Sequence, residues 1–82
     1  MVVSYVLIST APDKDHEVYD KLSKLPDIVE LHPLFGEYDL IAKLEPEDWS
    51  DVERIVTDGI RAVDGVIDTK TLIGMSFKNL LG

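Results

Sequence analysis

Residues 34–41 read LFGEYDLI and lie at the middle of an 82-residue chain. Apolar residues stand on both sides of a short polar turn that has a glycine at its head. Glycine tolerates a positive φ where a chain reverses, so this pattern is typical of a β-hairpin. The hairpin divides the sequence into two halves of similar layout.

The first half opens on a strand and a helix. β-Branched and aromatic residues predict a strand over residues 2–9, and its lack of alternation indicates that both of its faces are buried. A helix is predicted over residues 14–25, with Asp13 as its N-cap. Its buried side repeats at helical spacing: Val18, Leu22 and Leu25.

The two strands of the hairpin are predicted over residues 28–35 and 39–45. Pro33 lies inside the first of them and has no N–H for a sheet ladder, which confines that strand to a sheet edge or a bulge. The second strand alternates, so Leu40 and Ala42 point to one face while Ile41 points to the other.

The second half repeats the helix and the strand. Ser50 and Glu53 have the spacing of a capping box, and Gly65 is suited to the left-handed position after the helix end. The apolar face of this helix is predicted to comprise Trp49, Val52, Ile55, Val56, Ile60 and Val63. The fourth strand covers residues 66–73, and the tail 74–82 is ambiguous between a short strand and a helical turn.

The element order is therefore βαββαβ, and the fold class is α+β. Right-handed crossovers place strands 1 and 3 at the centre of a four-stranded antiparallel sheet. We expect a ferredoxin-like two-layer sandwich in which residues 1–82 form a single domain. Two helices cover only one sheet face, yet strand 1 is apolar on both sides, and Ile41, Ile67 and Ile73 add further apolar positions. The uncovered face predicts a homodimer that pairs sheet to sheet.

Composition excludes several functional classes. The chain has a formal net charge of −8 and scattered Lys and Arg residues, which argues against direct binding of nucleic acid. It contains no cysteine, so disulfides and thiol chemistry are excluded. No apolar run reaches the roughly 20 residues of a membrane helix, and the N-terminus lacks the basic lead of a signal peptide. We expect a cytoplasmic protein without membrane contact.

Two polar groups match the requirements of a free amino acid. The turn offers backbone N–H groups at Gly36, an aromatic hydroxyl at Tyr38 and a carboxylate at Asp39, and strand alternation places Thr69 and Thr71 on one face. The carboxylate of an amino acid needs N–H and O–H donors, its ammonium needs a carboxylate, and its side chain needs an apolar wall. Each group also has a purely structural interpretation. The first is an ordinary hairpin turn, and the second reflects the β-propensity of threonine on an edge strand.

The sequence resembles the effector-binding domain of the Lrp/AsnC (feast/famine) transcriptional regulators, also called the RAM domain. The resemblance covers nearly the whole chain and rests on the segments YVLI (5–8), FGEYDL (35–40), IRAVDGV (60–66) and TKTLI (69–73). It implies dimers that pair sheet to sheet and assemble into rings, often octamers. It also implies amino-acid effectors bound between dimers, near Gly36, Tyr38 and Asp39 of one and Thr69 and Thr71 of a neighbour.

The sequence differs from the full-length regulators of this family in one respect. They carry an N-terminal helix-turn-helix domain, whereas this chain begins directly at strand 1. We expect a stand-alone, non-enzymatic amino-acid sensor that modulates full-length Lrp/AsnC regulators or other partners. No catalytic residue, metal or cofactor is expected.

Two other functions stay open. One is a small cofactor-free oxygenase or isomerase, in which a His, Tyr or Asp in the sheet–helix cleft moves a proton. His16 and His32 lack the spacing of paired ligands and are interpreted as surface residues, and Trp49 as a core or interface anchor. The other is a purely structural role, in which the chain mixes into rings of full-length regulators and changes their valency.

Overall fold

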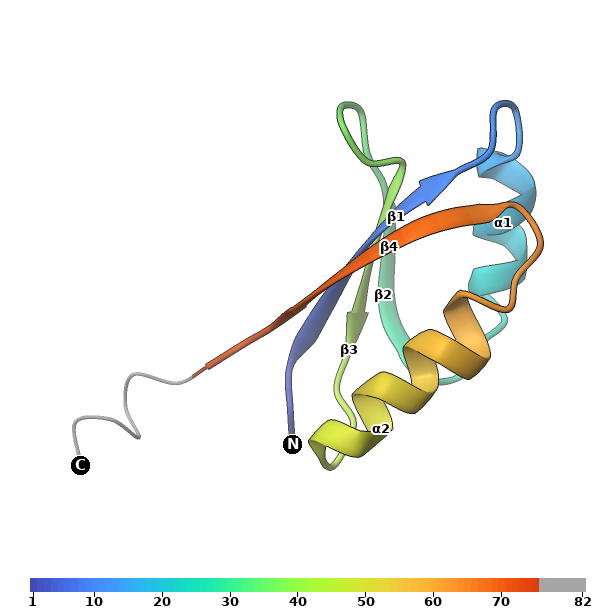
Figure 1. Cartoon of the computed structure of the whole chain (residues 1–82). Helices are drawn as coiled ribbons and strands as arrows, with labels where there is room; N and C mark the ends of the chain where they lie inside the picture. The colour runs from blue at the N-terminus through green and yellow to red at the C-terminus, as the bar shows by residue number, and fades with distance from the viewer. Residues whose placement is uncertain (76–82) are drawn as a thin grey trace.

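The computed structural model describes residues 1–75 of the chain. The strands are β1 (Ser4–Thr10), β2 (Ile28–Pro33), β3 (Leu40–Leu44) and β4 (Val66–Ile73). The helices are α1 (Asp15–Leu22) and α2 (Trp49–Arg54), and α2 continues into a π-helical segment, η1 (Ile55–Ile60). Both helices lie on the same side of the sheet (Figure 1). No helix among the described residues is long and apolar enough to span a membrane.

The four strands form one antiparallel sheet in the order β2-β3-β1-β4. This confirms the ferredoxin-like βαββαβ sandwich and the central position of the first and third strands. Pro33 ends β2, which is an edge strand, so its missing N–H removes no hydrogen bond from the interior of the sheet.

The core lies between the sheet and the helices. Alternate residues of the two central strands point into it, and they are Val6, Ile8, Leu40, Ala42 and Leu44. The helices contribute Val18, Leu22, Val52, Ile55, Val56 and Ile60. The expectation that both faces of strand 1 are buried is wrong for the single chain, because Ser4, Val6, Ile8 and Thr10 are buried while Tyr5 is exposed.

The opposite sheet face, here called the open face, carries no helix. The strand register places Tyr5, Leu7, Ile41 and Leu72 on it. Ile73 pairs with the buried Ser4, so it faces the helices, and its assignment to the second face was wrong. Ile67 is 64% exposed and lies where the register between β1 and β4 shifts.

Both predicted N-caps are wrong. The residue before α1 is Lys14, which makes no side-chain cap, and Asp13 adopts a φ of 65° in the preceding turn. At α2 the cap is Asp48, whose carboxylate accepts a hydrogen bond from the Asp51 N–H, and the Ser50 hydroxyl donates to the same carboxylate. Asp48 therefore replaces the predicted Ser50–Glu53 capping box.

Strand ends differ from the prediction by one or two residues, whereas β4 has its predicted bounds. Gly65 has a φ of 104°, which confirms the positive φ expected after the second helix. Gly74 and Met75 have no regular secondary structure, and the rest of the predicted ambiguous tail, residues 76–82, lies outside the described residues.

Candidate functional site

The β2–β3 turn carries three of the predicted site residues. Gly36 has a φ of 148°, and a Cβ added there would meet no atom within 4 Å. Tyr38 and Asp39 are half-buried, whereas Phe35 at the tip of the turn is fully exposed. The Leu34 N–H donates to the Asp39 carbonyl over 2.8 Å and closes the turn.

Asp39 also has a structural task. Its carboxylate accepts a hydrogen bond from the Thr10 N–H over 2.8 Å, and its own N–H donates to the Ile8 carbonyl over 2.9 Å. β3 begins only at Leu40, which pairs with Ile8, so Thr10 lies beyond the part of β1 that pairs with β3. The Asp39 side chain therefore supplies the Thr10 N–H with the acceptor that β3 does not provide at this position. Its second carboxylate oxygen makes no hydrogen bond within residues 1–75.

Thr69 and Thr71 lie on one face of β4, as predicted. Thr69 pairs with Ile8 and Thr71 with Val6, so both threonines stand on the face that the helices cover. Thr69 is half-buried and Thr71 is exposed, because α2 and η1 leave a gap beside this edge strand.

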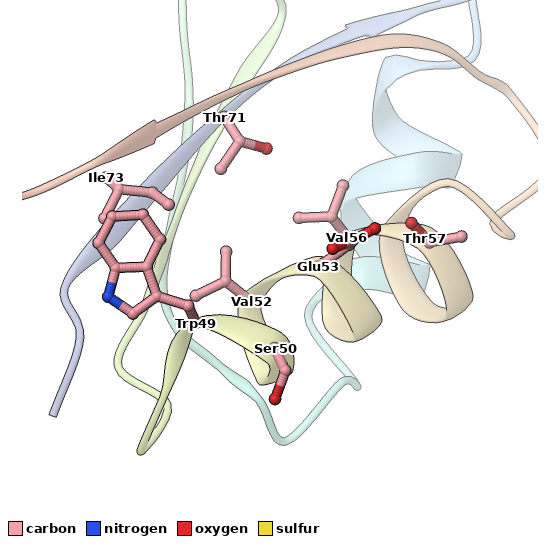
Figure 2. Close-up of a pocket in the computed structure, with 8 residues that line it drawn as sticks. All are labelled: Trp49, Ser50, Val52, Glu53, Val56, Thr57, Thr71 and Ile73. Atoms are coloured by element: carbon pink, nitrogen blue, oxygen red, sulfur yellow. The ribbon is translucent and has the colours of Figure 1, made fainter.

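That gap is a pocket of about 320 Å³ between α2 and β4. Its lining residues are Trp49, Ser50, Val52, Glu53, Val56, Thr57, Thr71 and Ile73. Figure 2 shows Thr71 pointing from β4 toward the helix, with Val52 and Val56 pointing back from the helix. The Trp49 indole lies next to Ile73, and the Ser50 side chain points away from β4.

The predicted site residues do not meet within one chain. The turn with Gly36 lies at one end of the sheet, and α2 begins near the other end (Figure 1). Asp39 and Thr69 flank Ile8 from its two sides, so their backbones are two strand spacings apart, about 10 Å. Thr71 lies further along β4. One chain therefore presents two separate halves of the predicted site.

Sequence reasoning missed the helical wall of the pocket. Trp49 was interpreted as a core or interface anchor, but 66% of its surface is exposed, so it is not a core residue. Glu53 was interpreted as a capping residue and instead lies at the pocket. The available signal was the spacing of Trp49, Val52 and Val56, which marks one helix face and extends beyond the part that the sheet covers.

Lys43 on the open face belongs to a cluster of paired charges. The Lys43 ammonium lies 3.4 Å from the Glu30 carboxylate and 3.6 Å from that of Glu45. The pKa of Glu30 is lowered, first by its hydrogen bond with His32 and then by Lys43. The pKa of Lys43 is raised, first by its hydrogen bond with Glu30. This cluster is an ion network at the sheet surface.

A second groove, of about 250 Å³, lies between α1 and the ends of β2 and β3. Its polar residues are Asp15, His16, Tyr19 and Asp20. His16 is exposed, as predicted, and none of these four side chains hydrogen-bonds to another within the described residues. A general base needs a partner that positions it, and this groove offers none in residues 1–75. No group of His, Asp and Glu residues in that range is arranged to hold a metal ion.

The fold, with an apolar, polar-rimmed pocket beside an edge strand, defines a small ferredoxin-like ligand-binding domain. A family model described as the Lrp/AsnC ligand binding domain matches residues 3–78. The chain belongs to the Lrp/AsnC family, which confirms the resemblance of the turn and β4 segments.

Individual relatives agree with this assignment. An uncharacterized HTH-type transcriptional regulator from Pyrococcus abyssi is 33% identical over 73 residues, which cover 85% of this chain and 49% of the relative. The chain thus spans about half the length of the curated relatives it matches.

Two solved structures share the fold. The crystal structure of FFRP-DM1 is 36% identical, with a TM-score of 0.86 over 92% of this chain and 100% of that chain. The Neisseria meningitidis transcriptional regulator NMB0573, solved as a complex with L-Met, is 18% identical, with a TM-score of 0.81 over 92% of this chain and 50% of that chain. The family model describes a ligand binding domain, and the relatives are named as transcriptional regulators, which together support a regulatory, effector-binding role.

Proposed function

We propose that the chain is a non-enzymatic amino-acid sensor whose effector binds between the dimers of a homo-oligomer. Gly36, Tyr38 and Asp39 of one subunit and Thr69 and Thr71 of a neighbour contact the effector. The observation that carries this proposal is the separation of the two halves within one chain. Each half is accessible and incomplete by itself, so a neighbouring copy is needed to complete the site.

The chemistry of the two halves supports an amino acid as the effector. The free oxygen of the Asp39 carboxylate suits an ammonium group, and the Tyr38 and Thr71 hydroxyls suit a carboxylate. The methionine complex of NMB0573 shows that one protein with this fold binds an amino acid.

The assembly that we propose is a homodimer formed through the open face, with dimers joined into an octamer-like ring. Leu7 and Ile41 lie side by side at the centre of the open face, and Tyr5 and Leu72 lie next to them. Lys43 is already paired with Glu30 and Glu45, so covering this face does not bury the Lys43 ammonium unpaired.

A mechanism follows from a site shared between subunits. An effector that contacts two subunits binds the assembled state better than the separated one, and it shifts the equilibrium by that difference in affinity. The signal is then read by a partner, either a full-length Lrp/AsnC regulator or another protein in the cytoplasm. Direct contact with DNA is disfavoured by the net charge of −8.

Isothermal titration calorimetry with a panel of amino acids tests the proposal on Asp39 variants. Asp39→Ala is expected to abolish binding while the dimer survives, but it also leaves the Thr10 N–H without its acceptor, which costs about 1–3 kcal/mol. Asp39→Asn is the sharper variant, because its amide oxygen still accepts from Thr10 while the charge is removed. We expect a loss of affinity of at least about tenfold in Asp39→Asn at unchanged stability.

The matched control is Glu37→Gln, which removes an exposed carboxylate from the same turn. It is expected to bind as the wild type does. Unchanged affinity in Asp39→Asn removes Asp39 from the site, and a wild-type protein that binds no amino acid ends the proposal. Native mass spectrometry on the same samples reports the stoichiometry and any change of assembly caused by the effector.

A further inference from the structure

The pocket between α2 and β4 has an apolar floor and walls. Val52 is 3% exposed and Val56 is 8% exposed, and they form the floor from the helix side. Ile73 and the Trp49 indole close one end, as Figure 2 shows. Thr71 is the residue of this pocket that also belongs to the predicted effector site. The pocket is therefore continuous with one half of that site.

Its size is sufficient for one amino-acid side chain. The volume of about 320 Å³ is at the lower end of the range of ligand pockets. Trp49 is a large aromatic residue that is two-thirds exposed beside this pocket. A ligand that covers its ring removes apolar surface from water, which favours binding.

The polar groups of the pocket lie at its rim. Glu53 and Thr57 are exposed, and Ser50 points away with its hydroxyl on the Asp48 carboxylate. A polar side chain seated on Val52 and Val56 loses hydrogen bonds to water without replacement. An acidic side chain is in addition repelled by the Glu53 carboxylate, and a cation paired with an exposed carboxylate gains little.

We infer that the effector is an amino acid with an apolar side chain, which lies in this pocket between Trp49, Val52, Val56 and Ile73. The inference rests on the proposed function and adds the effector class and the residues that select it. The main-chain part of the effector lies beside Thr71 and extends out of the pocket toward the Gly36–Asp39 turn of the neighbouring copy. Trp49 and Val56 are thus specificity-determining residues.

The chain contains its own probe for this pocket, since Trp49 is its single tryptophan. Tryptophan fluorescence of the full chain is to be followed during titration with L-leucine, L-methionine and L-phenylalanine, and with L-asparagine, L-lysine and L-glutamate for comparison. We expect the three apolar amino acids to shift or quench the emission in a saturable way, and to bind at least about tenfold tighter than the polar three.

Val56→Thr keeps the shape of the floor and replaces a methyl group by a hydroxyl, and it retains the fluorescent probe. It is expected to weaken L-leucine binding by about tenfold or more, because the ligand's apolar side chain then contacts a polar group in the floor. Val29→Thr is the matched control, since Val29 is 50% exposed on β2 and does not line the pocket. It is expected to leave the affinity unchanged. Glu53→Gln is likewise expected to change L-leucine affinity by less than about twofold.

The outcomes separate this inference from the proposed function. Apolar amino acids that shift Trp49 emission and lose affinity in Val56→Thr support it. Binding that calorimetry detects without a change in Trp49 emission overturns the inference and leaves the proposed function standing. An affinity that is unchanged in Val56→Thr does the same. Tighter binding of L-lysine than of the apolar amino acids, if it is lost in Glu53→Gln, also overturns the inference, in favour of a cationic effector. A wild-type protein that binds no amino acid overturns both.

Discussion

Gly65 brings the second half of the fold into close contact with α1 of the first half. Its φ of 104° lies in the region that side chains rarely adopt, and a Cβ added there would be 2.7 Å from the Val18 Cγ2. Val18 is fully buried in α1 and has no room to retreat. The absence of a side chain at Gly65 lets the chain turn into β4 directly against α1.

Gly65→Ala is therefore expected to lower the free energy of unfolding by about 1–3 kcal/mol, through backbone strain and a steric clash together. Urea denaturation measures this. Gly59→Ala is the matched control, because its φ is unstrained and the nearest contact of its Cβ would be an ordinary 3.7 Å from Leu25. It is expected to be neutral or mildly stabilising. Equal stabilities of the two variants would contradict this account of Gly65.

At the residue scale, sequence reasoning succeeded where backbone conformation decides and failed where packing decides. Gly36 and Gly65 both have the predicted positive φ. The hydrogen bond from Thr10 to the Asp39 carboxylate joins residues 29 positions apart and depends on where β3 begins, which no local pattern reveals. The exposure of Trp49 depends on how far the sheet extends beneath α2, so its helical spacing alone suggested burial.

At the scale of elements, the N-terminus of α2 is stabilised by Asp48. The Asp48 carboxylate lies 2.7 Å from the Ser50 hydroxyl and 3.2 Å from the Asp51 N–H. These hydrogen bonds lower the pKa of Asp48, with that from Ser50 the largest cause. A carboxyl with a lowered folded pKa contributes stability above its unfolded value, 3.8 in this case, and loses it as the pH falls through the folded pKa.

Asp48→Ala is expected to lower Tm by a few degrees near neutral pH, because it removes the acceptor that caps the helix. The difference from the wild type is expected to shrink as the pH falls below 3.8, where protonation removes the same acceptor in the wild type. Differential scanning calorimetry as a function of pH measures both effects. Glu53→Ala is the control, and a larger loss of Tm there than in Asp48→Ala would support the capping box predicted from the sequence instead.

The elements themselves were predictable and their ends were not. Apolar periodicity located every helix and strand of the described residues, because it reflects burial along a whole element. Cap positions depend on one or two hydrogen bonds, and Asp48 and Ser50 were equally good candidates from residue type. Residue type and apolar periodicity do not distinguish the π-helical segment η1 from an α-helix.

At the scale of the whole molecule, topology followed from the element order and the handedness of the crossovers. The open face was predicted in outline, as a sheet surface without helices, but not in composition. Alternating register places Lys43, Lys70 and Asp68 on it among the apolar residues. This face is thus apolar at its centre and charged toward both edges, which resembles the core and rim of an interface between proteins.

Leu7 lies on the central strand of the open face, between Ile41 on β3 and Lys70 on β4. Leu7→Lys is expected to weaken dimerisation by about 100-fold or more. The reason is that the dimer would bury an additional unpaired ammonium near Lys70 of the same chain, whereas the separated subunit leaves it in water. Sedimentation equilibrium over a range of concentrations measures this change.

Phe35→Lys is the matched control for dimerisation, since it places the same charge on a fully exposed side chain at the hairpin tip, away from the open face. It is expected to leave the dimer intact, although a ring that uses the hairpin would be lost. The two variants therefore separate association through the sheet from association through the turn. A Leu7→Lys protein that still dimerises as the wild type does would show that the copies meet elsewhere, and it would contradict the dimer proposed through the open face.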